Sequence, residues 1–353
     1  MITNIATRYY DYWQNFNYNT IILDIENTNL QNIIILGENE FYVWAPNEFI
    51  DLVNKKNISV KFITGCAKTN AVYDQSVVTS IQNCNLEFYP EYHFAYCNQQ
   101  FSKAIAVQRY YDLYNEHTLT HPFVCLMNRP HLHRIYAIEE IAKNQLLSKG
   151  VVTWNDFTDE FEHVKKHHNF SWKHFHGNKI QLDDFFLNTD SNIYNSYNLS
   201  KEYFTALFDF VIESSHELIG ISEKTIRPLI YQKPFLILGA VGINKYLKQL
   251  GFELYDEIFD YTFDSEPELE TRCILYIENI KRISDEKKLS KIYKRLREKI
   301  NFNYEMYKKM TDYRNHRLPI ELKKIFPLIQ SNIKKEELGV LAKYRAIFNL
   351  RDY

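Results

Sequence analysis

Apolar and polar positions alternate in short blocks over the first third of the chain. The pattern predicts strands over Thr20–Ile25, Asn32–Leu36, Ser59–Thr64 and Asn85–Tyr89, and a short helix over Pro46–Lys55. Strands and helices that follow one another in this way are typical of an α/β sandwich with a largely parallel sheet. We therefore expect the chain to open with an α/β domain.

A second unit of the same kind follows a break near Asn115–Pro122. Phe123–Met127 (FVCLM) is apolar throughout, which suits a strand covered on both faces of a parallel sheet. A polar turn, a helix over Arg134–Leu147 and a strand over Val151–Trp154 complete this unit. The pattern predicts a second α/β domain.

The same pattern returns over residues 205–252. It predicts a strand over Ala206–Ile212, a helix near Ile221–Pro228, a strand over Pro234–Leu238 and a helix over Gly242–Leu250 that ends at Gly251. Polar residues follow the ends of these strands. In open α/β sheets ligands bind at the carboxyl ends of the strands, so we expect a ligand at this edge.

The chain has 353 residues, a length that favours two domains, with three as the alternative. Its formal net charge of -2 conceals a strong division, with -5 over residues 1–121, -8 over 122–280 and +11 over 281–353. We therefore expect one α/β domain over residues 1–121, a second over 122–280 and a basic helical extension over 281–353.

Two interpretations of the basic extension remain open. Apolar residues at helical spacing, among them Ile283, Leu289, Ile292, Leu296 and Ile300, separate the basic ones. The segment is either a solvated helix that packs on a domain through this stripe, or a surface that meets the phosphates of nucleic acid or anionic lipid.

Composition excludes several classes of protein. Hydrophobic residues make up 45% and charged residues 24%, as in a globular protein with a real core. No run of about 18 apolar residues is present, so we expect no membrane-spanning helix. The 5 cysteines are odd in number and form no CxxC pair, which favours reduced thiols and a cytoplasmic location.

The candidate chemistry lies around residues 213–227. Ser222 is a predicted helix N-cap, and the positive end of a helix there suits a phosphate. Lys224 and Arg227 are one helical step apart and add positive charge. Glu213 and Glu223 can accept hydrogen bonds from sugar or ribose hydroxyls. The alternative is an ordinary charge cluster on a helix surface, because neither a Walker loop nor a GxGxxG fingerprint is present.

The stretch FVIESSHELIGISEKTIRPLIYQKPFLILGA resembles the donor-site motif of the α-1,3-fucosyltransferase family and of phage-encoded and bacterial glycosyltransferase-like proteins. Glu213 and Glu223 are ten residues apart, as in the family, and Lys224 follows directly. FVCLMNRPHLHR also resembles the strand-plus-Asn opening of the family's donor domain. The resemblance covers roughly residues 122–255.

The resemblance implies two facing Rossmann-like domains, the GT-B architecture, with residues 1–121 on the acceptor side and 122–280 binding a nucleotide sugar. It implies that Arg134, Glu223 and Lys224 contact the diphosphate and ribose. The full set of candidate donor-binding residues is Arg134, Glu213, Ser222, Glu223, Lys224, Thr225 and Arg227.

An inverting transferase of this kind needs a general base from the N-terminal domain. The candidates at predicted strand ends are Asp24, Glu26, Glu38 and Glu40. Gly37-Glu38-Asn39 resembles a Gly-Glu-Asn turn that carries the base in the fucosyltransferases, which favours Glu38 as the catalytic residue. A competing alignment places Cys66 at that position.

Histidines crowd one stretch of the chain, and His163 and His167 have the i,i+4 spacing of metal ligands. No partner set completes a recognised zinc pattern, so we expect a metal-independent enzyme. The nucleotide sugar is then a co-substrate, and no cofactor is expected.

Three hypotheses for function follow. The first is transfer of a sugar to a hydroxymethylated pyrimidine in DNA, with the basic segment holding the DNA. The second is a fucosyltransferase-like enzyme that acts on a surface glycan or a lipid-linked acceptor. The third is a non-catalytic polyanion-binding protein on the same fold.

Overall fold

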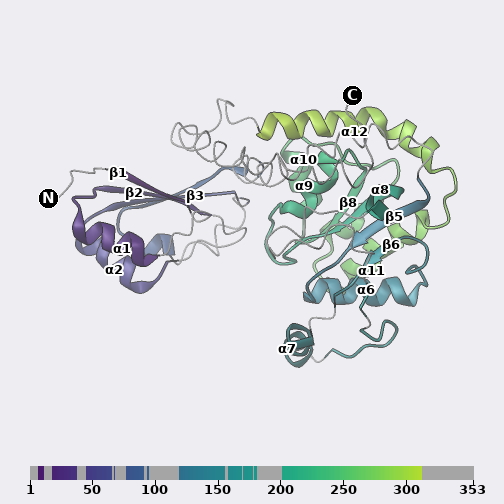
Figure 1. Ribbon diagram of the computed structural model, residues 1–353, viewed down its shortest axis with the longest axis horizontal. Helices are drawn as coiled ribbons and strands as arrows, with labels where there is room; N and C mark the ends of the chain where they lie inside the picture. The colour runs from purple at the N-terminus through teal and green to yellow at the C-terminus, as the bar shows by residue number, and fades with distance from the viewer. Residues whose placement is uncertain are drawn as a thin grey trace, which may run out of the picture.

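The computed structural model describes residues 7–11, 18–37, 45–65, 67, 77–90, 94, 119–155, 158–168, 170–177, 179–180 and 201–311. Within them the chain forms two four-stranded sheets, and every strand pair is parallel. Helices accompany each sheet (Figure 1). The chain is therefore a mixed α/β protein with Rossmann-like parallel sheets, as the sequence predicts.

The first sheet follows chain order. Its strands are β1 (Thr7–Asp11), β2 (Asn32–Gly37), β3 (Ser59–Thr64) and β4 (Cys84–Phe88), in the order β1-β2-β3-β4. The helices α1 (Tyr18–Asn27) and α2 (Asn47–Lys55) connect the first three strands and cover the same face (Figure 1). Right-handed crossovers that all run in one direction place their helices on one side of the sheet.

The predicted strand over Thr20–Ile25 is wrong, because these residues lie in α1. Ile21, Ile22 and Ile25 are buried on one side of this helix, while Leu23 is 57% exposed on the other. This i, i+1, i+4 spacing fits a helical face better than a strand. Asp24 and Glu26 therefore lie on a helix and not at the end of a strand.

In the second sheet the order of the strands does not follow the order of the chain. Its strands are β5 (His121–Leu126), β6 (Val151–Thr153), β7 (Ala206–Ile212) and β8 (Phe235–Leu238), and they lie in the order β6-β5-β7-β8. The chain leaves β5 through α6 (Leu132–Lys143) and β7 through α9 (Glu223–Ile230), on opposite faces (Figure 1). Where strand order reverses, here between β5 and β7, open α/β sheets form a crevice at their carboxyl ends.

The remaining helices complete the layers around the second sheet. They are α7 (Thr158–His168), α8 (Lys201–Thr205), α10 (Ile243–Gln249), the short 3-10 helix η4 (Thr262–Ser265), α11 (Leu269–Ile283) and α12 (Leu289–Thr311). α11 packs beside α6 on one face, and α12 lies along α9 on the other (Figure 1).

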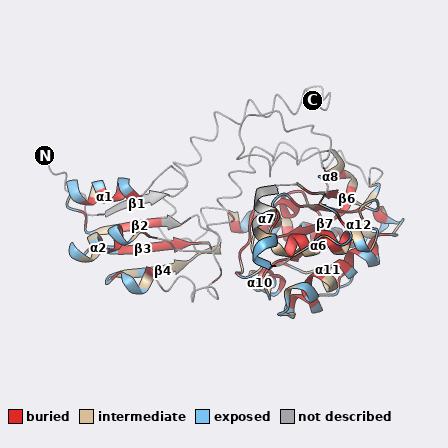
Figure 2. Ribbon diagram, turned by 90° about the horizontal axis from the view of Figure 1, so that it is seen from below, coloured by how far each residue is buried: buried red, intermediate tan, exposed pale blue. Residues whose placement is uncertain are grey.

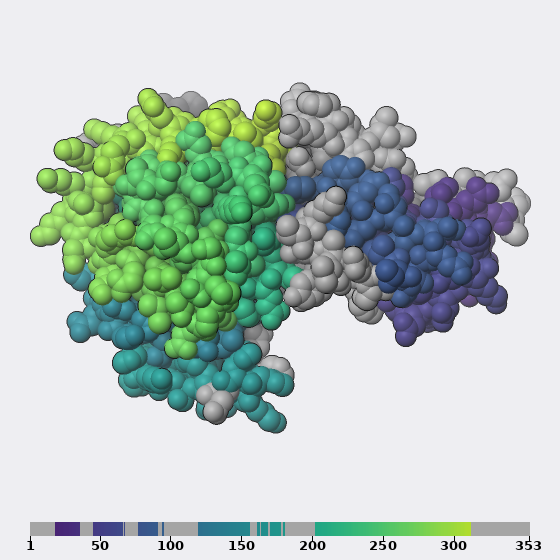
Figure 3. Space-filling view, turned by 180° about the vertical axis from the view of Figure 1, so that it is seen from behind, coloured from purple at the N-terminus to yellow at the C-terminus, as the bar shows by residue number. Residues whose placement is uncertain are grey.

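The predicted apolar stripe of the basic segment is confirmed. Ile283, Leu289, Leu296 and Ile300 are buried in the core of the second sheet, and Ile292 packs against it. The expected boundary between residues 280 and 281 falls inside α11. From behind, the residues of α12 lie along the outer surface of the molecule (Figure 3).

Each sheet has a hydrophobic core of its own (Figure 2). Phe94 belongs to the second core although the sequence predicts residues 1–121 as the first domain. Its ring is fully buried and stacks on Phe252, with 5.6 Å between the ring centroids. No helix in the described parts of the chain is long and apolar enough to cross a bilayer.

Candidate functional site

The carboxyl end of β5 carries exposed polar residues. Asn128 and Arg129 are exposed there. The Thr153 hydroxyl at the end of β6 accepts a hydrogen bond from the Met127 backbone amide at 3.0 Å, and the side-chain Nδ2 of Asn155 donates to Asn128 Oδ1 at 3.1 Å. These contacts fix the strand end, from which Arg129 reaches into solvent.

The helix α6 begins at this edge without a cap. Its N-cap residue, His131, makes no side-chain capping bond, and no acidic residue lies in the first turn. The positive end of the helix dipole therefore has no carboxylate from its own first turn to compensate it. Such a helix terminus is a ready site for a phosphate.

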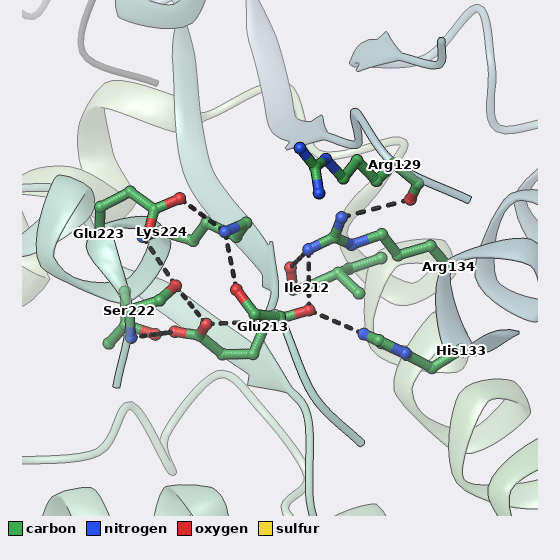
Figure 4. A network of polar contacts seen from close by, with 10 residues as sticks. Arg129, His133, Arg134, Ile212, Glu213, Ser222, Glu223 and Lys224 are labelled. Carbon is green, nitrogen blue, oxygen red and sulfur yellow. Dashed lines mark hydrogen bonds and ion pairs between the residues drawn. The ribbon is translucent and has the colours of Figure 1, made fainter. Parts of the chain in front are cut away.

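Arg134 and His133 tie α6 to the end of β7 (Figure 4). Arg134 Nη2 donates to the Glu213 carbonyl oxygen at 2.9 Å, and Nη1 donates to the Arg129 carbonyl at 3.2 Å. His133 Nε2 also donates to the Glu213 carbonyl, at 2.7 Å. Arg134 is 2% exposed, so its cation joins the ends of β5 and β7 from within. Arg134 therefore positions the two strand ends from inside the protein, whereas the sequence predicts that it contacts the ligand.

Burial and nearby positive charges lower the pKa values of His131 and His133, the two histidines beside Arg134. Burial, and next the charges of Arg134, Lys224 and Arg129, lower the pKa of His131 to about 3. Burial and Arg134 also hold the pKa of His133 well below its usual range. Both rings are therefore neutral near pH 7. Arg134, Lys224 and Arg129 therefore each contribute to the low pKa of His131.

Glu213 directly follows β7 and is fully buried. Its Oε1 accepts from the Ser222 amide at 3.1 Å and from the Thr225 hydroxyl. Its Oε2 accepts from the Ser214 amide at 3.1 Å and from the Ser222 hydroxyl. Because both oxygens are bonded within the chain, Glu213 and Thr225 position α9, and the prediction that they contact a ligand directly finds no support here.

Ser222 caps α9 as the sequence predicts, since its hydroxyl accepts from the Lys224 amide at 3.2 Å. Lys224 Nζ donates to the Ser214 hydroxyl at 2.9 Å and pairs with Glu223 Oε1 at 2.6 Å. The side chains of Lys224 and Glu223 are 19% and 17% exposed, respectively. Lys224 and Arg129 reach toward one another across the two strand ends (Figure 4).

Arg227 does not lie at this edge. Its Nε and Nη2 donate to the two carboxylate oxygens of Asp209 in β7, each at 2.9 Å. Asp209 is fully buried and Arg227 is 5% exposed. The predicted pairing of Arg227 with Lys224 on one ligand-facing side is therefore wrong, because the buried carboxylate of Asp209 holds Arg227 in the core.

Some candidates are not placed by the structure. Glu38, Glu40 and Cys66 lie outside the described residues, as does the side chain of His163. His167 is exposed on α7. In the portion of the chain that is described, no group of three or more His, Cys, Asp or Glu side chains could hold a metal ion.

The structure adds Arg129 and His131 to the site. The sequence carries the signal for both, because MNRPHLHR directly follows the apolar strand FVCLM. The rule that polar residues after buried strands meet at one edge, which selects Glu213, also selects Arg129.

Comparison with protein-family models, with curated proteins and with solved structures finds no match to this chain. Fold and geometry therefore define the protein as a Rossmann-like α/β protein with a cationic site at the strand-order reversal of its second sheet.

Proposed function

We propose that the chain is a nucleotide-sugar-dependent glycosyltransferase with two facing Rossmann-like domains, the GT-B architecture. One observation carries the proposal. The uncapped positive end of α6 lies with Lys224 and Arg129 at the carboxyl ends of β5 and β7. A helix terminus and two cations at such a crevice suit the diphosphate of a nucleotide sugar.

Each residue of the site has a proposed part in donor binding. Lys224 and Arg129 bind the diphosphate oxygens, and Glu223 accepts a hydrogen bond from a ribose or sugar hydroxyl. Arg134 and Glu213 hold the two strand ends and α9 in place through the bonds described above. The resemblance to the fucosyltransferase donor motif points to Arg134, Glu223 and Lys224, and this proposal keeps Glu223 and Lys224 as direct contacts and gives Arg134 a positioning part.

The proposed reaction is a metal-independent inverting displacement. Glu38 takes the proton of the acceptor hydroxyl as the acceptor oxygen forms a bond to the anomeric carbon. The bond from that carbon to the diphosphate breaks, and the nucleoside diphosphate leaves with the electron pair. Lys224 and Arg129 stabilise the negative charge that develops on it.

We propose a hydroxymethylated pyrimidine in DNA as the acceptor. A surface glycan or lipid-linked acceptor is the alternative within the same reaction. The basic surface of α12, described below, favours a polyanionic partner, and it equally suits a non-catalytic polyanion-binding protein as a second candidate.

Thermal denaturation with a panel of nucleotide sugars tests the donor site. We expect one nucleotide sugar to raise the melting temperature of the parent and of Glu38→Gln, but not that of Lys224→Ala. Chromatography then measures release of the nucleoside diphosphate, which Glu38→Gln should abolish while binding persists. If no nucleotide sugar stabilises the protein, the proposed donor site is wrong.

A further inference from the structure

The turn before α12 and the first half of that helix carry a dense, one-sided positive charge. Residues 287–297 contain six Lys and Arg and no Asp or Glu. Lys287, Lys288, Lys291, Arg295 and Arg297 are all exposed. In the helical part of this segment the cations from Lys291 to Arg297 extend over about 9 Å of the helix axis. We call the surface made by these five residues the α12 basic face.

The charges of the α12 basic face are not neutralised locally. Among the described residues, no carboxylate lies within ion-pair distance of Lys291, Arg295 or Arg297. The opposite holds for Lys299 on the same helix, which pairs with Glu257 at 2.6 Å. Lys308 pairs with Glu305, also at 2.6 Å. The basic face is therefore a local excess of charge on a chain whose formal net charge is -2.

The opposite side of α12 fixes the orientation of this face. Leu289, Leu296 and Ile300 are buried in the core of the second sheet. Their burial fixes the rotation of α12 about its axis, so the exposed cations stay on the side of the helix that faces away from the core. Figure 3 shows α12 at the outer surface of the molecule. A surface with fixed cations loses little conformational freedom when it meets a row of phosphates.

Charge complementarity selects the class of partner. A basic helix that binds a membrane inserts an exposed apolar face beside its charges. The apolar side of α12 is committed to the core, and Phe302, 43% exposed, is the large hydrophobic residue that its described surface exposes. A nucleic-acid duplex, with one phosphate charge per about 1.7 Å of its axis, needs only the cations.

We propose that the α12 basic face binds the phosphate backbone of nucleic acid. Binding is electrostatic and independent of base sequence, because Lys and Arg that contact phosphates carry no base readout. Its use to hold an acceptor DNA rests on the proposed glycosyl transfer, whereas the binding itself does not.

Fluorescence anisotropy of a labelled DNA duplex, at low and at physiological salt, tests the proposal with the full chain. Lys291→Glu/Arg295→Glu should weaken binding by about tenfold or more and reduce the salt slope by about 2. Lys165→Glu/Lys166→Glu on α7 makes the same change in net charge at exposed positions and should bind DNA within about twofold of the parent. Equal losses in the two variants, or no loss in either, would overturn the proposal.

A second variant guards against a folding defect in α12. Lys287→Glu/Lys288→Glu lies in the turn before the helix and should also weaken DNA binding. Co-sedimentation with phosphatidylserine vesicles is the alternative arm, and binding to vesicles without binding to DNA contradicts the proposal. Stabilisation by a nucleotide sugar should be unchanged in both α12 variants, so failure of DNA binding and failure of the donor site are distinguishable.

Discussion

Arg227 and Asp209 form the most deeply buried ion pair of the described residues. The guanidinium binds both carboxylate oxygens of Asp209, and the Tyr203 hydroxyl donates to the same carboxylate at 2.7 Å. Asp209 and Tyr203 are both fully buried. A buried carboxylate is stable only while its partners remain, so this cluster matters for stability and not for ligand binding.

Replacement of Arg227 tests that assignment. Arg227→Met leaves the carboxylate of Asp209 without its ion partner, and the free energy of unfolding should fall by about 3 kcal/mol. Lys224→Met, one turn away at the edge of the site, should cost less than about 1 kcal/mol. Urea denaturation measures both. Equal costs for the two variants would show that Arg227 is not a buried structural cation.

Lys233 gives the same cluster a pH dependence. Lys233 is 1% exposed, its ammonium donates to the Ala206 carbonyl, and burial lowers its pKa to about 7. An unfolded chain keeps this proton up to about pH 10. Between pH 7 and 10 the unfolded state therefore binds more protons, and the free energy of unfolding rises with pH by up to about 1.4 kcal/mol per unit.

Lys233→Met should remove that contribution. Urea denaturation at several values between pH 7 and 10 compares the slope of stability against pH for the parent and the variant. The parent should gain stability with rising pH relative to Lys233→Met. Parallel curves would mean that Lys233 loses its proton at the same pH in the folded and unfolded states.

At the scale of elements, two helices begin at the carboxyl edge of the second sheet in different ways. At the start of α9 the Ser222 hydroxyl accepts a hydrogen bond from the Lys224 amide, and Glu213 holds Ser222 in place. The helix α6, in contrast, has no side-chain cap. We therefore expect the proposed phosphate site at the first turn of α6, with Lys224 and Glu223 contributed by α9 from the opposite face of the sheet.

A capping substitution separates stability from binding at α6. His131→Asp supplies an N-cap and a favourable charge for the helix dipole, so it should raise stability by about 0.5–1 kcal/mol. The same carboxylate repels a phosphate, and affinity for a nucleoside diphosphate should fall by about tenfold or more. Urea denaturation and calorimetric titration measure the two effects.

His131→Asn is the matched control, because Asn caps a helix about as well as Asp but carries no charge. It should gain similar stability and lose much less affinity. If the Asp and Asn variants bind the diphosphate equally well, α6 does not form the phosphate site.

The sequence predicts seven of the eight strands in the described part of the chain, and its failures have physical causes. Thr20–Ile25 contains β-branched residues that favour a strand, yet packing on the sheet decides for α1. β1 (TRYYD) contains no aliphatic residue, so its hydrophobic pattern gives no strand signal. The apolar runs of β5, β7 and β8 are predicted within about two residues because both faces of that sheet are covered.

The site is predicted only in part for a similar reason. Sequence spacing finds the Ser222 cap and the position of Lys224 because both depend on local helix geometry. It cannot find the place of Arg227, because that depends on Asp209, which stands 18 residues away in a strand. Nor can it find that the Glu213 carboxylate accepts a hydrogen bond from the Ser222 amide, nine residues further along the chain.

At the scale of the whole molecule, the two sheets differ in a way that assigns their roles. The first sheet runs in chain order with α1 and α2 on one face, while the second reverses between β5 and β7 with helices on both faces. Only a reversal of strand order opens a crevice between crossover helices on opposite faces. We therefore expect the phosphorylated ligand at the second sheet.

Calorimetric titration with a nucleoside diphosphate, and with the matching nucleoside, tests the central claim most directly. The diphosphate should bind the parent protein and bind far more tightly than the nucleoside, because the proposed donor site recognises phosphate. Lys224→Ala and Arg129→Ala should each weaken it by about tenfold, while Lys165→Ala on α7 should leave it unchanged. Binding of the nucleoside and the diphosphate with equal affinity, or equal binding by all three variants, would contradict the account.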